Sequence, residues 1–195
     1  MNRPAEFLFA TCQIGAERAL KSELARAWPD FRFAYSRHGF LTFKLPPEHG
    51  LADDFALDSV FARTHGFSLG QAEGLDPYTL AEQVWKLVGV RRFDRLHVWQ
   101  RDLLPAGDHG YEPGPTEAAK LARDAILAPR LGPADEAGRA ATVGWLGPTE
   151  PGDRVLDCIV CEANEWWVGT HRAASQASCW PGGFCPISLP VDAVS

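Results

Sequence analysis

This sequence of 195 residues lacks the short motifs that most nucleotide-binding enzymes carry. No two glycines lie two residues apart, so GxG and GxGxxG fingerprints are absent, and no Gly-Lys-Ser or Gly-Lys-Thr is present for a P-loop. No apolar run approaches the ~18 residues that span a bilayer. The N-terminus also lacks the basic and then apolar layout of a signal peptide. These absences argue against a nucleotide cofactor in this chain and predict a cytoplasmic protein.

Cysteine is scarce, and five cysteines, an odd number, do not make a disulfide framework. Cys158 and Cys161, followed by Cys179 and Cys185, come close to a four-cysteine zinc spacing. Cys158 and Cys161 are three residues apart in a predicted strand, so their side chains point to opposite faces. This spacing favours core cysteines over zinc, and we predict no metal ligand and no bound cofactor in this chain.

No local signature supports nucleophilic catalysis. Cys12, His38, His97 and His171 could meet in space, but no GxSxG motif accompanies them. Paired carboxylates are plentiful only in acidic loops, where solvation is their usual role. We therefore predict no catalytic residue.

Positive charge is also in short supply, because acidic residues outnumber basic ones and the net charge is -6. This average argues mildly against a nucleic-acid partner, but it conceals a pattern. Residues 1–45 carry seven Lys or Arg against four Asp or Glu, and residues 86–101 carry five against one. Two basic stretches can converge into one patch after folding, or they can stay dispersed.

The hydrophobic content of 46% supports a real core, and the pattern predicts an α+β protein of two units. The first unit, residues 1–70, has the strand-helix-strand-strand-helix-strand order of a ferredoxin-like subdomain. Its strands are predicted over 6–12, 31–36, 40–45 and 60–69, and its helices over 14–28 and 51–57. Residues 71–76 are predicted to be a linker.

The second predicted unit spans residues 77–190. Asp76 caps a helix that Pro77 opens and Gly89 ends. A strand over 95–101, a loop over 105–115, a helix over 116–131 and a strand over 141–146 follow. A hairpin over 154–172 turns at 163–165 and closes the unit.

Basic residues at turns and strand ends are the candidates for phosphate contacts. Trp166, Trp167 and Trp180 could stack on bases, although sheet packing is the more common role of tryptophan. The RNA-binding candidates are Arg37, His38, Arg91, Arg92, Arg95, Arg101, His171 and Arg172.

Three segments of the sequence resemble a known family. They are FLFATCQIGAERALKSEL, FRFAYSRHGFLTFK, and WWVGTHRA with PGGFCPISLPVDAVS. They are similar to the N-terminal half of bacterial large-subunit rRNA ribose 2'-O-methyltransferases, in which a THUMP-type RNA-binding region precedes an FtsJ-like catalytic domain. Thr11–Glu17 matches the start of the family's ferredoxin-like subdomain, and Trp167–His171 matches its THUMP fold.

The resemblance implies an rRNA-binding module made of a ferredoxin-like subdomain and a THUMP-like subdomain. Residues 191–195 would begin the connection to a methyltransferase domain that binds S-adenosylmethionine and lies outside this chain. The expected partners are rRNA and that domain, and no membrane. The alternative is an acidic protein-interaction scaffold that docks on a catalytic partner.

Overall fold

The computed structural model describes residues 5–105, 107–108, 116–129 and 146–184. These residues form one seven-stranded mixed sheet in the order β2-β3-β1-β4-β7-β6-β5, with three α-helices, which is an α+β architecture. Among the seven strands, β5 and β6 pair in parallel and all other neighbours pair antiparallel. None of the helices in these ranges is long and apolar enough to cross a membrane.

The N-terminal half of the sheet is covered by a single helix. Its elements are β1 (Phe7–Thr11), α1 (Glu17–Ala27), β2 (Arg32–Arg37) and β3 (Phe40–Lys44). Leu20 and Leu24 of α1 are buried against alternate residues of β1, including Leu8. The Glu17 carboxylate accepts hydrogen bonds from Gly15 N and Gly39 N, at 2.9 Å and 2.7 Å. One side chain thus ties the start of α1 to the β2–β3 turn.

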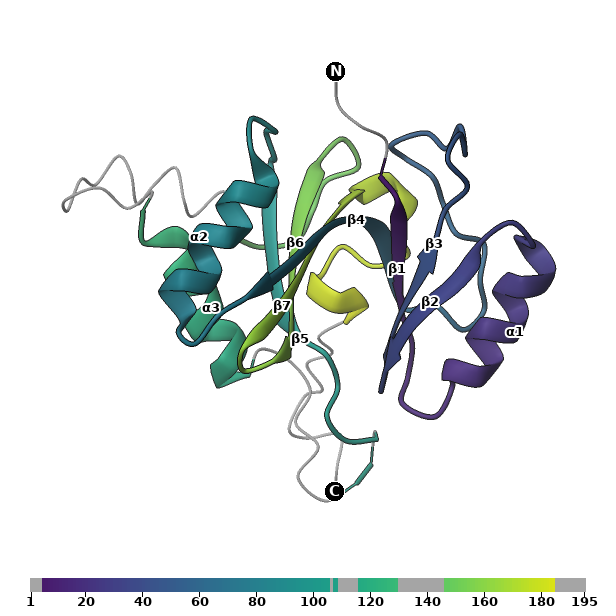
Figure 1. The fold of residues 1–195 in the computed structure, drawn as a ribbon, viewed down its shortest axis with the longest axis horizontal. Helices are drawn as coiled ribbons and strands as arrows, with labels where there is room; N and C mark the ends of the chain where they lie inside the picture. The colour runs from purple at the N-terminus through teal and green to yellow at the C-terminus, as the bar shows by residue number, and fades with distance from the viewer. Residues whose placement is uncertain (1–4, 106, 109–115, 130–145, 185–195) are drawn as a thin grey trace, which may run out of the picture.

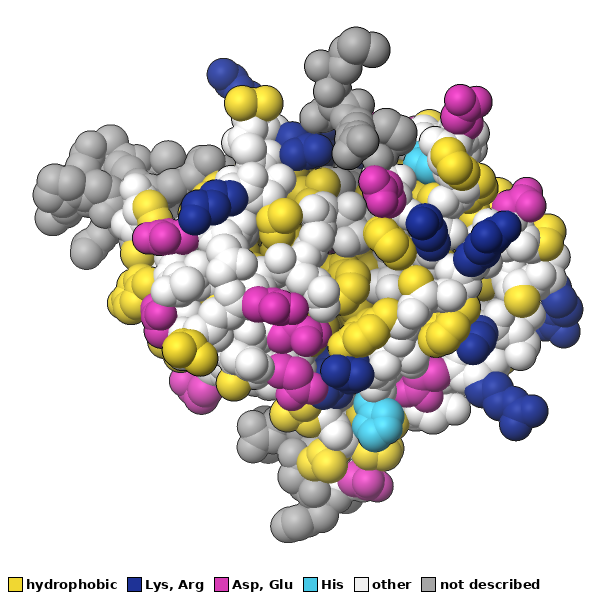
Figure 2. Space-filling model, viewed as in Figure 1, with side chains coloured by type: hydrophobic (Ala, Val, Ile, Leu, Met, Phe, Trp, Pro, Cys, Tyr) yellow, Lys and Arg dark blue, Asp and Glu magenta, His cyan; other side chains and the backbone are white. Residues whose placement is uncertain are grey.

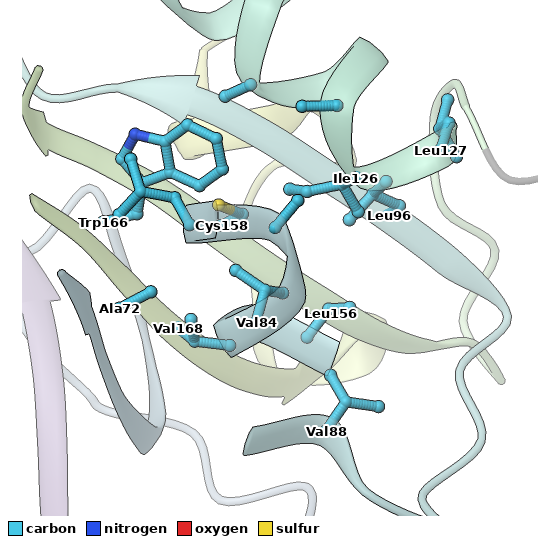
Figure 3. Close-up of a cluster of buried hydrophobic side chains, with 14 of the residues drawn as sticks. Ala72, Val84, Val88, Leu96, Ile126, Leu127, Leu156, Cys158, Trp166 and Val168 are labelled. Carbon is cyan, nitrogen blue, oxygen red and sulfur yellow. The ribbon is translucent and has the colours of Figure 1, made fainter. Parts of the chain in front are cut away.

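The C-terminal half packs two helices on one face of the sheet (Figure 1). Its elements are α2 (Pro77–Val88), β5 (Arg95–Gln100), α3 (Glu117–Leu127), β6 (Arg154–Glu162) and β7 (Glu165–Arg172). Figure 3 shows Val84 and Val88 of α2 facing Leu156, Cys158 and other strand residues in this core. Burying such side chains stabilises the fold by roughly 1.5–3 kcal/mol each.

Strand β4 (Thr64–Glu73) joins the two halves, because it pairs with β1 along its first residues and with β7 along the rest. The strand curves from the part of the molecule that carries α1 to the part that carries α2 and α3 (Figure 1). The register shifts between Ser68 and Gly70, where Gly70 has φ +136°. The inner face of the arch is filled by a third apolar cluster, which consists of Phe9, Phe40, Trp99, Ile159, Cys161 and Trp167.

The structure confirms most of the predicted elements. Helix α2 begins after Asp76, whose carboxylate accepts from Tyr78 N and Thr79 N, both at 3.0 Å, and ends at Gly89 with φ +59°. The hairpin of β6 and β7 turns at residues 163–164, within the predicted turn over 163–165. Helix α1 begins three residues later than predicted, and α3 ends at Leu127.

The predicted helix over 51–57 is wrong. The segment is irregular, because Leu57 N donates to the buried His65 imidazole and Phe55 packs on Trp28 at the edge of the N-terminal core. The helix that a ferredoxin-like order requires between β3 and β4 is therefore missing from residues 45–63.

The predicted strand over 60–69 is shifted in the structure. It begins at Thr64 and extends to Glu73, through three residues of the predicted linker. The division into a ferredoxin-like and a THUMP-like subdomain stays a prediction. Most of the predicted loop over 105–115, nearly all of the predicted strand over 141–146, and the connection at 191–195 lie outside the described residues.

Candidate functional site

An open groove of about 590 Å³ runs across the outer side of β4, between the two halves of the sheet. Its walls are the segment around residues 49–53 on one side and the residues after α2 on the other. In Figure 1 both segments lie at the end of the molecule from which the N-terminus emerges. The groove therefore brings together residues that are far apart in the sequence.

One end of the groove is a basic recess, defined by Arg91, Arg154 and Arg172 around Asp53. Arg154 begins β6 and Arg172 ends β7, and the two residues are paired across the ladder. Arg91 follows α2, and its Nη1 donates to Leu87 O and Val88 O, at 3.2 Å and 3.3 Å, so it caps the helix while it lines the recess.

The basic recess has a surplus of positive charge. Asp53 Oδ2 lies 2.6 Å from Arg154 Nη2 and 3.7 Å from Arg172 Nη2, so one carboxylate serves two guanidinium groups, and Arg91 adds a third cation. The arginine side chains of these two ion pairs keep 35% and 32% of their surface exposed. A planar guanidinium group presents parallel N–H donors, and those that Asp53 does not occupy can bind two oxygens of a phosphate.

The middle of the groove is less polar. His49 stacks on Phe67, with ring centroids 5.9 Å apart and an interplanar angle of 16°. Leu51 N donates to His49 Nδ1 at 3.0 Å, and His49 Nε2 lies 3.2 Å from Ala5 O, so both ring nitrogens are held. A fixed aromatic and imidazole pair beside a cationic recess can accept a base next to its phosphate.

The structure brings two of the predicted candidates, Arg91 and Arg172, together at the basic recess. His171 also borders the recess, but its imidazole lies on the inner face of the sheet beside Asp157. Arg154 and Asp53 were missed. The hairpin register, counted from its turn, could have placed Arg154 beside Arg172.

The other predicted candidates do not line the recess. Arg95 Nε lies 3.1 Å from Asp153, and Arg101 Nη2 lies 2.6 Å from Glu162. Arg37, His38 and Arg92 are exposed or partly exposed at turns and strand ends. On the face drawn in Figure 2, Lys and Arg side chains lie among Asp and Glu side chains and form no continuous patch.

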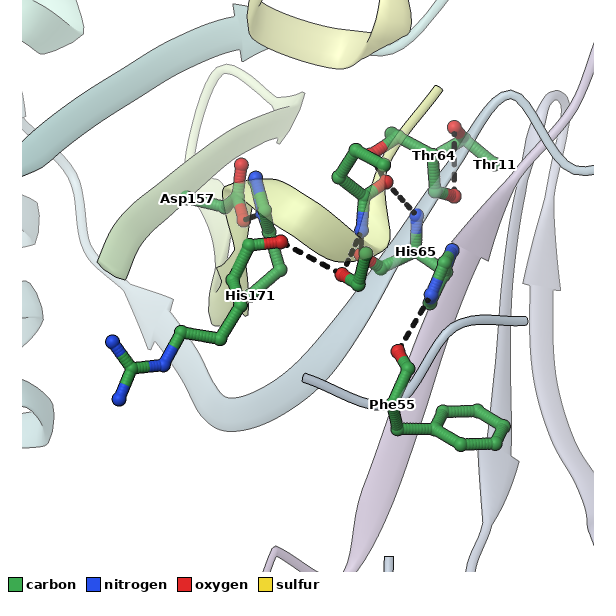
Figure 4. Close-up of polar contacts among 9 residues, drawn as sticks. Thr11, Phe55, Thr64, His65, Asp157 and His171 are labelled. Carbon is green, nitrogen blue, oxygen red and sulfur yellow. Dashed lines mark hydrogen bonds and ion pairs between the residues drawn. The ribbon is translucent and has the colours of Figure 1, made fainter. Parts of the chain in front are cut away.

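A polar cluster lies on the inner face of the C-terminal half. His97, Asp157 and His171 are 2%, 1% and 6% exposed, and His171 Nδ1 lies 2.5 Å from Asp157 Oδ2. Figure 4 shows this pair in the same region as Thr64 and His65 at the start of β4. Burial lowers the pKa of His97 to about 4, so its imidazole is neutral at physiological pH.

Of the four residues that could have met in space, His97 and His171 do lie close together, with ring centroids 5.9 Å apart, whereas Cys12 and His38 lie elsewhere. Cys12 belongs to the apolar core under α1, and burial raises the pKa of its thiol to about 12. A thiol with so high a pKa is a poor nucleophile. His38 is exposed in the β2–β3 turn.

The predicted placement of Cys158 and Cys161 on opposite faces is confirmed. Cys158 packs in the core under α2 and α3, and Cys161 packs in the inner cluster. Burial raises the pKa of both thiols. Cys179 is exposed, and Cys185 lies outside the described residues.

No family model and no curated protein matches the sequence. One similar solved structure is a possible methylase from Clostridium difficile 630, at 12% identity and a TM-score of 0.48, with 86% of this chain and 41% of that chain covered. Another is TrmN from Thermus thermophilus, at 11% identity and a TM-score of 0.43, with 84% and 44% covered. This chain thus spans less than half the length of either protein, and likenesses of this degree carry no functional conclusion.

Proposed function

We propose that this chain is an RNA-binding module, and that the groove across β4 is where the RNA binds. The observation that carries the proposal is the basic recess, in which three arginines surround one carboxylate. Phosphate groups would contact the guanidinium forks of Arg154 and Arg172, and an unstacked base would lie against Phe67 and His49. The net negative charge of the chain does not oppose this arrangement, because the local charge at the recess is positive.

The proposed role of the module is to recognise rRNA for a ribose 2'-O-methyltransferase domain that follows in the same protein. The sequence motifs at Thr11–Glu17 and Trp167–His171 support this part of the proposal. S-adenosylmethionine and the catalytic residues would belong to that other domain. We assign no catalytic or cofactor-binding residue to this chain.

The experiment is a salt series of RNA binding, measured by fluorescence anisotropy on labelled rRNA fragments. We expect micromolar binding at low salt, and at least a tenfold loss in the Arg154→Ala/Arg172→Ala variant. Each phosphate contact adds roughly 0.7 to the log–log salt slope for single strands, so the slope should fall by about 1.4.

The matched control removes two cations elsewhere. Lys120 and Arg123 lie on the exposed surface of α3 and pair with acids on the same helix. The Lys120→Ala/Arg123→Ala variant should bind RNA like the wild type. An equal loss in both double variants, or no binding of wild type at low salt, would reject the groove as the RNA site.

One observation favours the alternative, a protein-interaction scaffold. Leu75 is fully exposed just before α2, and Tyr78 is 67% exposed in its first turn, with Asp76 between them. An apolar pair with a carboxylate can dock on a protein partner. RNA affinity in a separately prepared catalytic half, together with none in this chain, would favour the scaffold.

A further inference from the structure

A polar triad crosses three neighbouring strands on the inner face of the sheet. His97 of β5 is paired with Asp157 of β6, and His171 of β7 lies two residues along from Gly169, the partner of Asp157. The three side chains share one face, because residues two or four further along the same strands, such as Trp99 and Ile159, fill the inner cluster.

The geometry of the triad suits a metal ion. Each of the three residues offers one ligand atom, and these atoms all lie within 4.8 Å of one another. Two imidazoles and one carboxylate form a set that binds zinc in three-ligand sites and iron(II) in facial triads. All three residues are at least nine-tenths buried, so water competes little for the site.

A second observation concerns His97 itself. His97 Nε2 is buried and has no hydrogen-bond partner within the part of the chain that the structure describes. A buried polar atom without a partner destabilises the folded state, because it has lost its hydrogen bonds to water. Coordination of a cation by this nitrogen would remove that cost, whereas the hydrogen bond between His171 and Asp157 does not reach it.

We propose that His97, Asp157 and His171 bind one divalent transition-metal ion that links β5, β6 and β7. Tetrahedral bonds of about 2.1 Å place ligand atoms about 3.4 Å apart. Asp157 Oδ2 and His171 Nδ1, now 2.5 Å apart, would therefore separate by about 1 Å on binding and release the proton that they share to solvent. The fourth position is left for a water molecule. This site differs from the sequence-based expectation of no metal, because only the pairing of three strands brings these residues together.

The first measurement is metal analysis of the full chain purified without chelators. We expect about one zinc or iron per chain, and the element found distinguishes these two ions. The metal-free protein is then titrated with Zn²⁺ by calorimetry, and with iron(II) under anaerobic conditions. Cobalt(II) added in place of zinc gives visible absorption bands that report the ligand geometry.

Variants assign the bound ion to the triad. His97→Gln should weaken Zn²⁺ binding at least 100-fold and abolish the rise of Tm that Zn²⁺ causes in the wild type. Asp157→Asn keeps the shape and a hydrogen-bonding group beside His171, and it should weaken binding similarly. Near-UV circular dichroism checks that both variants are folded, so the second variant serves if the first does not fold.

Two controls remove other metal-binding groups. His38→Gln removes an exposed imidazole in the β2–β3 turn, and Cys179→Ser removes an exposed thiol. Both variants should bind Zn²⁺ like the wild type. The proposal is overturned if the wild type binds neither zinc nor iron(II), or if His97→Gln and Asp157→Asn bind as tightly as the wild type. RNA binding plays no part in these measurements.

Discussion

The two halves of the sheet line their shared inner face with different chemistry. The N-terminal half contributes Phe9 and Phe40, with Tyr35 packed beside them. The C-terminal half contributes Trp99 and Trp167 to the same cluster and also carries the triad of His97, Asp157 and His171. The inner face of the sheet is thus aromatic toward the N-terminal half and carries potential metal ligands in the C-terminal half.

The same division holds on the outer side, in the groove. The three arginines of the basic recess come from the C-terminal half, whereas Asp53 and the ring of His49 come from the N-terminal half. The C-terminal half thus supplies the positive charge of the groove. The N-terminal half supplies the carboxylate that partly neutralises this charge and the ring that forms the opposite wall. Strand β4 holds the two together, so changes at the join should have the largest effect.

The largest expected effect is a loss of stability when a side chain is added at Gly169, where β7 pairs with β4. In Gly169→Ala the added Cβ would overlap Cε1 of the buried Phe9 and lie 2.8 Å from its Cδ1. Overpacking of this kind costs up to about 3 kcal/mol, which lowers Tm by roughly 6–12 °C in a chain of this size. Thermal unfolding followed by circular dichroism measures the change.

A matched glycine elsewhere controls for the substitution. Gly152 lies in a turn with nothing within 4 Å of an added Cβ, so Gly152→Ala should leave Tm within about 2 °C of wild type. If Gly169→Ala is equally mild, the two halves are not packed as tightly at the join as the distances indicate.

A second effect depends on His65, which sits at the start of β4 and faces groups of both halves. Burial lowers its pKa to about 4, Phe55 O lies 3.1 Å from its Nε2, and Asp157 and His171 are the nearby titratable groups. Between about pH 6.5 and pH 4 the unfolded chain binds this proton and the folded chain does not. The free energy of unfolding should therefore fall as the pH is lowered, by at most about 1.4 kcal/mol per unit.

The measurement is urea unfolding of the wild type and His65→Gln at several pH values from 4 to 7. The variant is less stable at pH 7 but should show a flatter pH dependence, because it has lost one group that titrates between the two states. An unchanged pH dependence would mean that other groups account for the acid sensitivity.

A third prediction separates two adjacent arginines that the sequence treats alike. Arg91 lines the basic recess and Arg92 does not. We expect Arg91→Ala to weaken RNA binding roughly three- to tenfold, and Arg92→Ala to change it less than twofold. Anisotropy titrations at one low salt concentration compare the two variants, and similar losses would contradict the assignment of the recess.

The smallest effect is a gain. Asp53→Asn removes the carboxylate that neutralises Arg154 and Arg172, while it keeps the size of the side chain. RNA affinity should rise about two- to fivefold at low salt, with a steeper salt dependence. Stability should change by less than about 1 kcal/mol, because the ion pairs are partly exposed. Weaker RNA binding in this variant would show that Asp53 orients the arginines and does not merely neutralise them.

Local sequence signals predicted the elements whose causes are local. The Asp76 cap, the Gly89 stop and the hairpin of β6 and β7 each depend on neighbouring residues, and all three were predicted correctly. The helix over 51–57 was wrong because contacts with distant residues decide the conformation of this segment. Phe55 is instead held by ring contacts, and Leu57 by a hydrogen bond to His65.

The candidate sites were less predictable. Arg91, His171 and Arg172 were named, but as members of a set of eight, most of which do not reach the recess. Asp53 and Asp157 were missed as site residues, because nothing in the sequence near them indicates an arginine or a histidine as a partner.

The sequence by itself determined the helix boundaries at Asp76 and Gly89, the hairpin, and the opposite directions of Cys158 and Cys161, because capping, turn formation and strand alternation act over a few residues. The tertiary structure decided that β4 joins the two halves, that Asp53 meets Arg154, and that His97 meets Asp157 and His171. These contacts depend on the order and register of strands that are distant in the chain, and local patterns do not contain that information.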